Sequence, residues 1–151
     1  MQIRKDDLLG AEIKALLEQH LAEAAEHSPP ESIHALDMNA LRNSGISFWT
    51  IWDGNDLAGC GALQKLDAAH GEIKSMRTAD AHKGKGVASA MLKHIIDEAV
   101  ACGINKLSLE TGSMDAYVPA WALYKRFGFE VCGPFADYVE DQYSIYMTRS
   151  I

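Results

Sequence analysis

Residues 82–89 read HKGKGVAS, and this stretch decides the fold because it places a glycine-rich turn directly before a helix. The strand-like run GEIKSMRT (71–78) leads into it. Behind it, apolar pairs return every four residues from Val87 to Val100, which predicts an amphipathic helix lying on a sheet. The first N–H groups of a helix lack intrahelical partners and the helix dipole adds positive charge, so the turn indicates an anion site.

The residues around the glycines exclude two familiar phosphate loops. A Walker A loop requires Lys and then Ser or Thr after its second glycine, whereas Val87 and Ala88 follow Gly86 here. A dinucleotide loop requires a third glycine where Ser89 stands, and a place after the first strand. On these residues alone, a solvated basic turn that only connects two elements remains the alternative.

The rest of the chain alternates strand-like and helix-like runs. Helical spacing of apolar residues covers 7–26, 33–42, 87–100 and 119–128. Pro29 and Pro30 end the first of these helices. Strand-like runs cover 1–5, 46–52, 57–66, 71–78, 105–112, 129–135 and 141–148. Gly59 and Gly61 permit close packing or a bulge in the third strand. This order predicts an α/β (α+β) fold with a mixed sheet, in one domain over residues 1–151.

Composition narrows the class of protein. The net charge is −7, from 14 Lys and Arg against 21 Asp and Glu, which disfavours general binding to nucleic acid. No apolar run approaches membrane-spanning length and the N-terminus has no signal-peptide core, so we expect a cytoplasmic protein that binds no membrane. The cysteines are Cys60, Cys102 and Cys132; their odd number and wide spacing predict reduced, buried thiols. The six His residues show no metal-ligand spacing, so we expect no metal.

Two distant segments together resemble the GCN5-related N-acetyltransferase (GNAT) family. KGKGVA (83–88) is similar to the family signature Q/R-x-x-G-x-G/A, with Lys83 where Gln or Arg is usual. AWALYKRFGF (120–129) is similar to the family's A-x-x-L-Y-x-x-x-G-F segment, and GEIKSMRT looks like its fourth strand. The resemblance covers nearly the whole chain and extends to the YsnE-like branch through LETGS (109–113) and CGPFADYVEDQYSIYM (132–147). It implies a mostly antiparallel sheet of about seven strands with flanking helices, splayed between strands 4 and 5.

The resemblance also implies a site for acetyl-coenzyme A (acetyl-CoA). The fourth strand would pair its backbone with the pantetheine arm at Met76, Arg77 and Thr78, and an N–H near Met76 would polarise the thioester carbonyl. The loop amides would bind the pyrophosphate, with the two lysines assisting. The implied loop residues are Lys83, Gly84, Lys85, Gly86, Val87, Ala88 and Ser89. Tyr117 departs from the family because Asn is often found at this position, and Ser113 or Asp115 would have to replace that contact.

Two acid–base roles follow from the same resemblance. Tyr124 matches the tyrosine that protonates the leaving thiolate, which a phenol with a reference pKa of about 10 can do while neutral at pH 7. Packing on the sheet is the alternative role for Tyr124. A carboxylate would deprotonate the acceptor amine, with Glu72 as the first candidate and Glu110 as the second. Glu110 shares a strand face with Ser108 by alternation, so it could also be a polar surface residue.

The implied function is acetyl-CoA-dependent N-acetyl transfer to a small-molecule or peptide amine, by direct attack on the thioester. Asp137, Tyr138 and Asp141 lie in a loop that could line the acceptor pocket. A homodimer is possible, since family members are often dimers. Two other functions remain open: a non-catalytic acyl-CoA-binding sensor of the same fold, and a nucleotide-binding domain that holds ATP on the glycine loop.

Overall fold

The fold is built on one seven-stranded sheet, and the computed structural model describes residues 1–33, 38–42 and 45–151. Neighbouring strands follow the order β1-β2-β3-β4-β5-β7-β6 and are antiparallel, except that β4 and β5 run parallel. The predicted mixed, mostly antiparallel sheet is therefore confirmed. The strands are β1 (Gln2–Lys5), β2 (Ile46–Asp53), β3 (Asp56–Lys65), β4 (His70–Thr78), β5 (Lys106–Gly112), β6 (Glu130–Cys132) and β7 (Ser144–Ser150).

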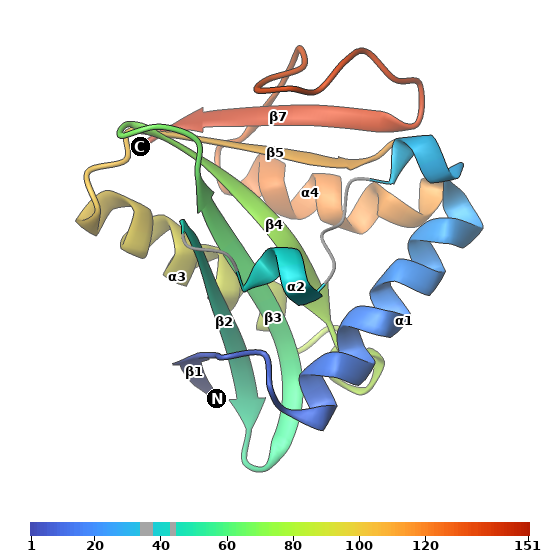
Figure 1. The fold of residues 1–151 in the computed structure, drawn as a ribbon, viewed down its shortest axis with the longest axis vertical. Coiled ribbons are helices and arrows are strands. Elements are labelled where there is room, and N and C mark those ends of the chain that lie inside the picture. The colour runs from blue at the N-terminus through green and yellow to red at the C-terminus, as the bar shows by residue number, and fades with distance from the viewer. Residues whose placement is uncertain (34–37, 43–44) are drawn as a thin grey trace.

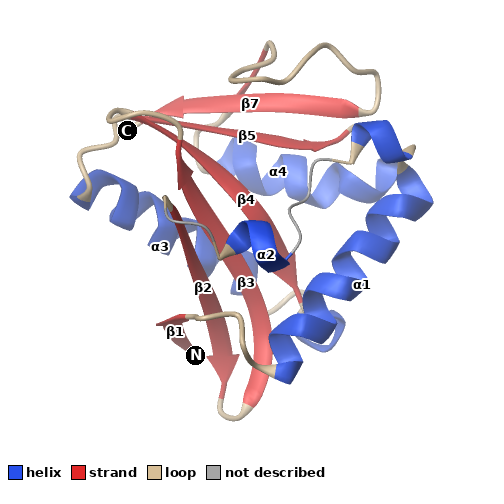
Figure 2. Cartoon of the chain, viewed as in Figure 1, coloured by secondary structure: helices blue, strands red, loops and turns tan. Residues whose placement is uncertain are grey.

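Helices cover both faces of the sheet, with α1 and α2 on one face and α3 and α4 on the other (Figure 1, Figure 2). They are α1 (Ala11–His27), α2 (Met38–Leu41), α3 (Val87–Ala101) and α4 (Val118–Arg126). Each face has its own buried apolar cluster. The α3 face includes Met91, Leu92 and Ile95, and the α1 face includes Ile13, Leu16 and Leu17. The helical periodicity read from the sequence thus matches the faces that the helices bury.

Three elements differ from their predicted bounds. The first helix begins at Ala11 rather than residue 7, because the side chains of Asp6 and Asp7 accept hydrogen bonds from the N–H groups two residues on and turn the chain there. A helix was predicted over 33–42. Among the described residues of that range, the helical part is α2. Residues 34–37 of the prediction lie outside the described residues. The strand predicted over 129–135 is only β6, which pairs with β7.

A bulge interrupts β4 where it faces β3. Cys60 pairs with Arg77 and Ala62 with Lys74, so Ser75 and Met76 share the place opposite Gly61. Ser75 takes a left-handed conformation with φ 56°. A Cβ on Gly61 would lie 2.8 Å from Met91 Cγ and 2.9 Å from Met76 Sδ, so only glycine lets α3 approach here. The close packing predicted at Gly61 of the third strand is therefore confirmed, and the bulge opposite it lies in β4.

β4 and β5 separate toward the C-terminal end of β4. Their parallel pairing runs from His70 with Lys106 to Ile73 with Leu109 and includes no residue further along β4. β5 continues against β7 to Gly112, while β4 continues against β3 to Thr78. The two strands diverge in Figure 1. The backbone edge of β4 from Lys74 to Thr78 therefore lacks a strand partner on the β5 side.

Other expectations concern the thiols and membranes. All three cysteines are free, but only Cys60 is buried; Cys102 is exposed near the end of α3 and Cys132 is half-buried, so the prediction of buried thiols is wrong for Cys102. Across the described ranges, no helix combines the length and apolar character needed to cross a bilayer.

Candidate active site

A cleft of about 1170 Å³ lies where β4 and β5 part. Its walls come from α1, β4, β5, the start of α3, α4 and the loop before β7. Glu110, Tyr117 and Tyr138 line it, while Lys85 is exposed and does not. Of the loop residues predicted for the acceptor pocket, Asp137 and Asp141 do not line it. The other residues predicted for catalysis or cofactor binding do: Glu72, Met76, Arg77, Thr78, Lys83, Gly84, Gly86, Val87, Ala88, Ser89 and Tyr124.

The glycine-rich loop forms one end of this cleft. Gly84 and Gly86 have φ of 78° and 79°, a left-handed conformation that favours glycine. Gly86 is the residue before α3, and its carbonyl accepts the first helical hydrogen bond from Ala90. The amides of Val87, Ala88 and Ser89 belong to the first turn, so they have no partner within the helix. The loop can therefore present backbone donors and a positive helix end to an anion.

Glu72 lies on β4 in a buried polar cluster. Its carboxylate is 4% exposed and forms an ion pair with Lys74, with Oε2 3.0 Å from Nζ. The Tyr138 hydroxyl donates to the same oxygen at 2.5 Å, and Lys74 Nζ lies 3.2 Å from that hydroxyl. Burial, and then the bond to Glu72, raises the pKa of Tyr138 well above its usual range. Glu72 is thus already neutralised by a cation and bonded to a hydroxyl.

Glu110 lies across the cleft on β5, one residue beyond the last β4–β5 pair. Burial raises its pKa from 4.5 to about 7. The nearby charge of Lys74 lowers this pKa and that of Glu72 raises it. A carboxyl with such a pKa exchanges a proton near neutral pH, which is the property that a general base needs.

Tyr124 lies on α4 and is 6% exposed. It packs edge-on against Phe129 with ring centroids 5.9 Å apart, and it lines the cleft as well. Burial, followed by the charge of Glu110, raises the pKa of Tyr124 above its usual range. The hydroxyl therefore stays protonated at neutral pH and can act as a hydrogen-bond donor.

The ring of Tyr117 closes one wall of the cleft by packing on Gly112. A Cβ on Gly112 would lie 2.2 Å from the Tyr117 ring. The His27 ring of α1 packs edge-on against the Tyr117 ring, with the ring centroids 6.1 Å apart. This explains how a large side chain fits where the family often has Asn. Neither Ser113 nor Asp115, the suggested substitutes, lines the cleft.

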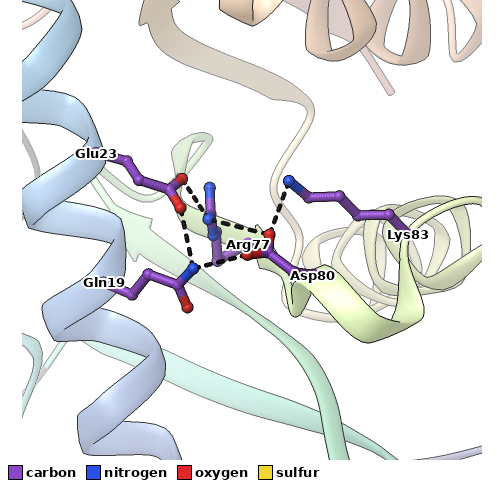
Figure 3. Close-up of polar contacts among 5 residues, drawn as sticks. All are labelled: Gln19, Glu23, Arg77, Asp80 and Lys83. Carbon is purple, nitrogen blue, oxygen red and sulfur yellow. Dashed lines mark hydrogen bonds and ion pairs between the residues drawn. The ribbon is translucent and has the colours of Figure 1, made fainter.

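A charged network joins α1 to the segment before the glycine loop (Figure 3). Arg77 of β4 pairs with Glu23 of α1, and its Nη2 lies 3.8 Å from Asp80. Asp80 also accepts from Gln19 at 2.9 Å and pairs with Lys83 at 2.9 Å. We call these five residues the clasp. The clasp connects α1, which forms a wall of the cleft, to the residues that directly precede the glycine-rich loop.

Several of these features were missed from sequence. Lys74 and the side-chain contacts of Arg77 were not anticipated, although alternation places Lys74 on the same face as Glu72. His82 is buried, and its Nε2 faces Asp53 of the β2–β3 hairpin at 3.8 Å. Among the described residues, no group of three or more His, Cys, Asp or Glu could hold a metal ion.

Comparisons with known proteins agree with this geometry. A profile of the Acetyltransferase (GNAT) family matches residues 12–129. The chain is 54% identical over its full length to the full length of YsnE from Bacillus subtilis, described as an uncharacterized N-acetyltransferase. A crystal structure from Klebsiella pneumoniae, described as a candidate acyl-CoA N-acyltransferase, superposes with a TM-score of 0.79 at 25% identity, covering 99% of this chain and 96% of that one. An aminoglycoside 6'-N-acetyltransferase complexed with coenzyme A has a TM-score of 0.72 at 14% identity, covering 99% and 97%.

The last of these likenesses concerns the fold alone, but the first two concern the sequence over most or all of the chain. The chain belongs to the acetyltransferase (GNAT) family and is an acyltransferase.

Proposed function

We propose that this protein transfers an acetyl group from acetyl-CoA directly to an amine acceptor. The observation that carries the proposal is the unpaired edge of β4 from Lys74 to Thr78, which faces a cleft ending at the glycine loop. An extended amide-containing chain such as pantetheine can hydrogen-bond to a free strand edge. A pyrophosphate suits the amides at the start of α3.

In this proposal each half of the cofactor has its own residues. The backbone of Met76, Arg77 and Thr78 binds the pantetheine arm, and the bulge turns the Met76 N–H away from the β3 ladder to meet the thioester oxygen. The pyrophosphate lies on the amides from Gly84 to Ser89. Lys83 adds charge once it leaves Asp80, and Lys85, which is exposed outside the cleft, assists from further away.

We assign the general base to Glu110 in preference to Glu72. Glu72 is bound by Lys74 and Tyr138, so taking a proton would break a buried ion pair. Glu110 has a pKa of about 7 and can accept a proton from an ammonium ion at neutral pH. Glu72 would then act by holding Lys74 and the loop residue Tyr138 in place.

The reaction follows in one transfer. The acceptor ammonium gives a proton to Glu110, and its nitrogen attacks the thioester carbon. As the tetrahedral intermediate collapses, the C–N bond remains and the C–S bond breaks. Tyr124 gives its hydroxyl proton to the departing sulfur and recovers one, through solvent, from the nitrogen. No bond to the protein forms.

The related proteins support the cofactor assignment. A structure with the same fold holds coenzyme A, and the full-length relative in Bacillus subtilis is described as an N-acetyltransferase. Among the described residues the cleft is also the larger of the two most prominent cavities, the other measuring about 310 Å³.

The test is release of free thiol from acetyl-CoA with a panel of amines, using wild type, Tyr124→Phe, Glu110→Gln and Glu72→Gln. We expect Tyr124→Phe and Glu110→Gln to lower kcat by about a hundredfold or more, since positioned acid–base groups contribute 10²–10⁴. Glu110→Gln should also remove the acidic limb of the pH–rate profile, whereas Glu72→Gln should keep that limb. Coenzyme A binding without acceptor-dependent thiol release would instead identify a sensor.

A further inference from the structure

We propose that the acceptor carries an anionic group, such as a carboxylate, close to its reactive amine, and that Arg77 binds this group. The inference rests on the proposed function, because it names the substrate class of the same cleft. Its basis is a donor nitrogen of Arg77 that faces the cleft from β4 and a proton-accepting carboxyl that lines the cleft from β5.

The acceptor must reach the β4 bulge from the α1 face. On the opposite face, Met91 and Ile95 of α3 pack against Gly61 and Met76 and fill the space. Lys74 and Arg77 flank the bulge on the α1 face, since they pair with Ala62 and Cys60 of the cluster beneath α1. An acceptor at the bulge therefore lies between these two cations and Glu110.

Arg77 has one donor nitrogen left for a ligand. Nη2 forms an ion pair with Glu23 and faces Asp80. Both Nη2 and Nε are buried, and neither has a hydrogen-bond acceptor among the described residues. Nη1 has no hydrogen bond or ion pair to the described residues and, unlike Nε, is not buried. Figure 3 shows a terminal nitrogen of Arg77 pointing away from the carboxylates of Glu23 and Asp80. Because Arg77 lines the cleft, this nitrogen can donate to an anion there.

An anion at this position would meet the cleft-facing donor of Arg77. The cations of this wall, Lys74, Arg77 and Lys83, each also pair with a carboxylate, from Glu72, Glu23 and Asp80 respectively. His20 of α1 is held neutral at pH 7, because burial and then the charge of Arg77 lower its pKa to about 4. A second ammonium group would face these cations, whereas a carboxylate would complete the bonding of Nη1. The amine of the same molecule would face Glu110, so an amino-acid-like acceptor satisfies both sides.

The experiment compares matched acceptors that differ in the anionic group. Thiol release from acetyl-CoA is measured with α-amino acids, with their amides and with the corresponding decarboxylated amines, for example phenylalanine, phenylalaninamide and phenethylamine. The variants are Arg77→Gln, Arg77→Lys and Glu23→Gln, with Arg4→Gln of the edge strand as a control outside the cleft. Coenzyme A affinity and urea unfolding of each variant show whether the cofactor site and the fold persist.

We expect wild type to prefer acids over the matched amines by at least tenfold in kcat/KM. Arg77→Gln should reduce kcat/KM for the acid by about ten- to a hundredfold, mainly through KM, and reduce it by a clearly smaller factor for the amine, since only the acid loses a charge-assisted hydrogen bond. Arg77→Lys should restore part of the preference. Glu23→Gln should increase the preference, because it removes the carboxylate that competes for Arg77. Arg4→Gln should change neither kcat/KM nor the preference for acids over amines.

Two results would overturn the inference in different ways. If amines without an anionic group react as well as the acids, and Arg77→Gln affects both alike, the acceptor class is wrong while the proposed acetyl transfer stands. If no acceptor in the panel releases thiol from wild type that binds coenzyme A, the proposed function fails and the inference fails with it.

Discussion

The substitution Glu110→Gln should stabilise the fold while it removes the proposed base. In the folded protein the pKa of Glu110 is about 7, compared with 4.5 for an ordinary Glu. Each pKa unit corresponds to about 1.4 kcal/mol, so ionising Glu110 above pH 7 costs the folded state about 3 kcal/mol relative to the unfolded chain. Gln has nearly the same shape and no charge, so it avoids this cost.

The pH dependence has a definite sign. Between pH 4.5 and about 7 the unfolded chain has lost the Glu110 proton and the folded chain keeps it, so the free energy of unfolding falls as pH rises through this window. Above pH 7 both states are ionised and the loss is complete. The advantage of Glu110→Gln over wild type should be about 1 kcal/mol at pH 5 and about 3 kcal/mol at pH 8.

Urea unfolding at pH 5 and pH 8 measures this difference directly, with Glu130→Gln on the exposed face of β6 as a matched control. The control should change the free energy of unfolding by at most about 0.5 kcal/mol at either pH. An equal effect of Glu110→Gln at both pH values, or destabilisation at pH 8, would show that Glu110 does not retain its proton in the folded state and would remove the reason for preferring it as the base.

Four other substitutions test different parts of the cleft. Gly86→Asp forces an L-residue into φ 79° and adds a negative charge to the loop, so isothermal titration should show loss of coenzyme A binding, whereas Lys85→Ala should weaken binding by less than tenfold. Gly112→Ala would place a Cβ 2.2 Å from the Tyr117 ring, so we expect the melting temperature to drop with a loss of about 1–3 kcal/mol, and an unchanged melting temperature would contradict this packing. Tyr124→Phe should leave coenzyme A affinity unchanged while kcat falls, and an unchanged kcat would reduce Tyr124 to a packing residue.

The order of elements and the glycine turn before α3 were predictable because they depend on local patterns. Apolar spacing in α3 and glycines at left-handed positions are properties of neighbouring residues. Gly61 also indicated close packing from the local sequence, because a residue without a side chain lets a neighbouring element approach the strand. These signals require no knowledge of which strands meet.

The chemistry of the carboxylates was not predictable, because distant contacts set it. Glu72 appeared the better base from its place on the strand, but Tyr138, which is 66 positions further along the chain, occupies its oxygen. Glu110 was only the second candidate, with a polar surface residue as the alternative, because alternation alone cannot tell that β5 loses its β4 partner after Leu109 and that the next side chain lines a cleft. Ser75 gave no signal either, since serine rarely adopts a left-handed conformation.

The two proposed acid–base groups influence each other in a way that suits the order of the reaction. The pKa of Tyr124 is raised first by burial and second by the negative charge of Glu110, which makes the phenol a poorer acid while Glu110 is ionised. Once Glu110 has taken a proton from the acceptor, that second cause disappears and the pKa of Tyr124 falls. Tyr124 thus becomes a better proton donor after the amine has been activated, when the sulfur leaves and needs a proton. Because the same loss of charge follows from Glu110→Gln, that variant should lower the pKa of Tyr124, and ultraviolet titration of its phenol against the Tyr124→Phe background would detect the change.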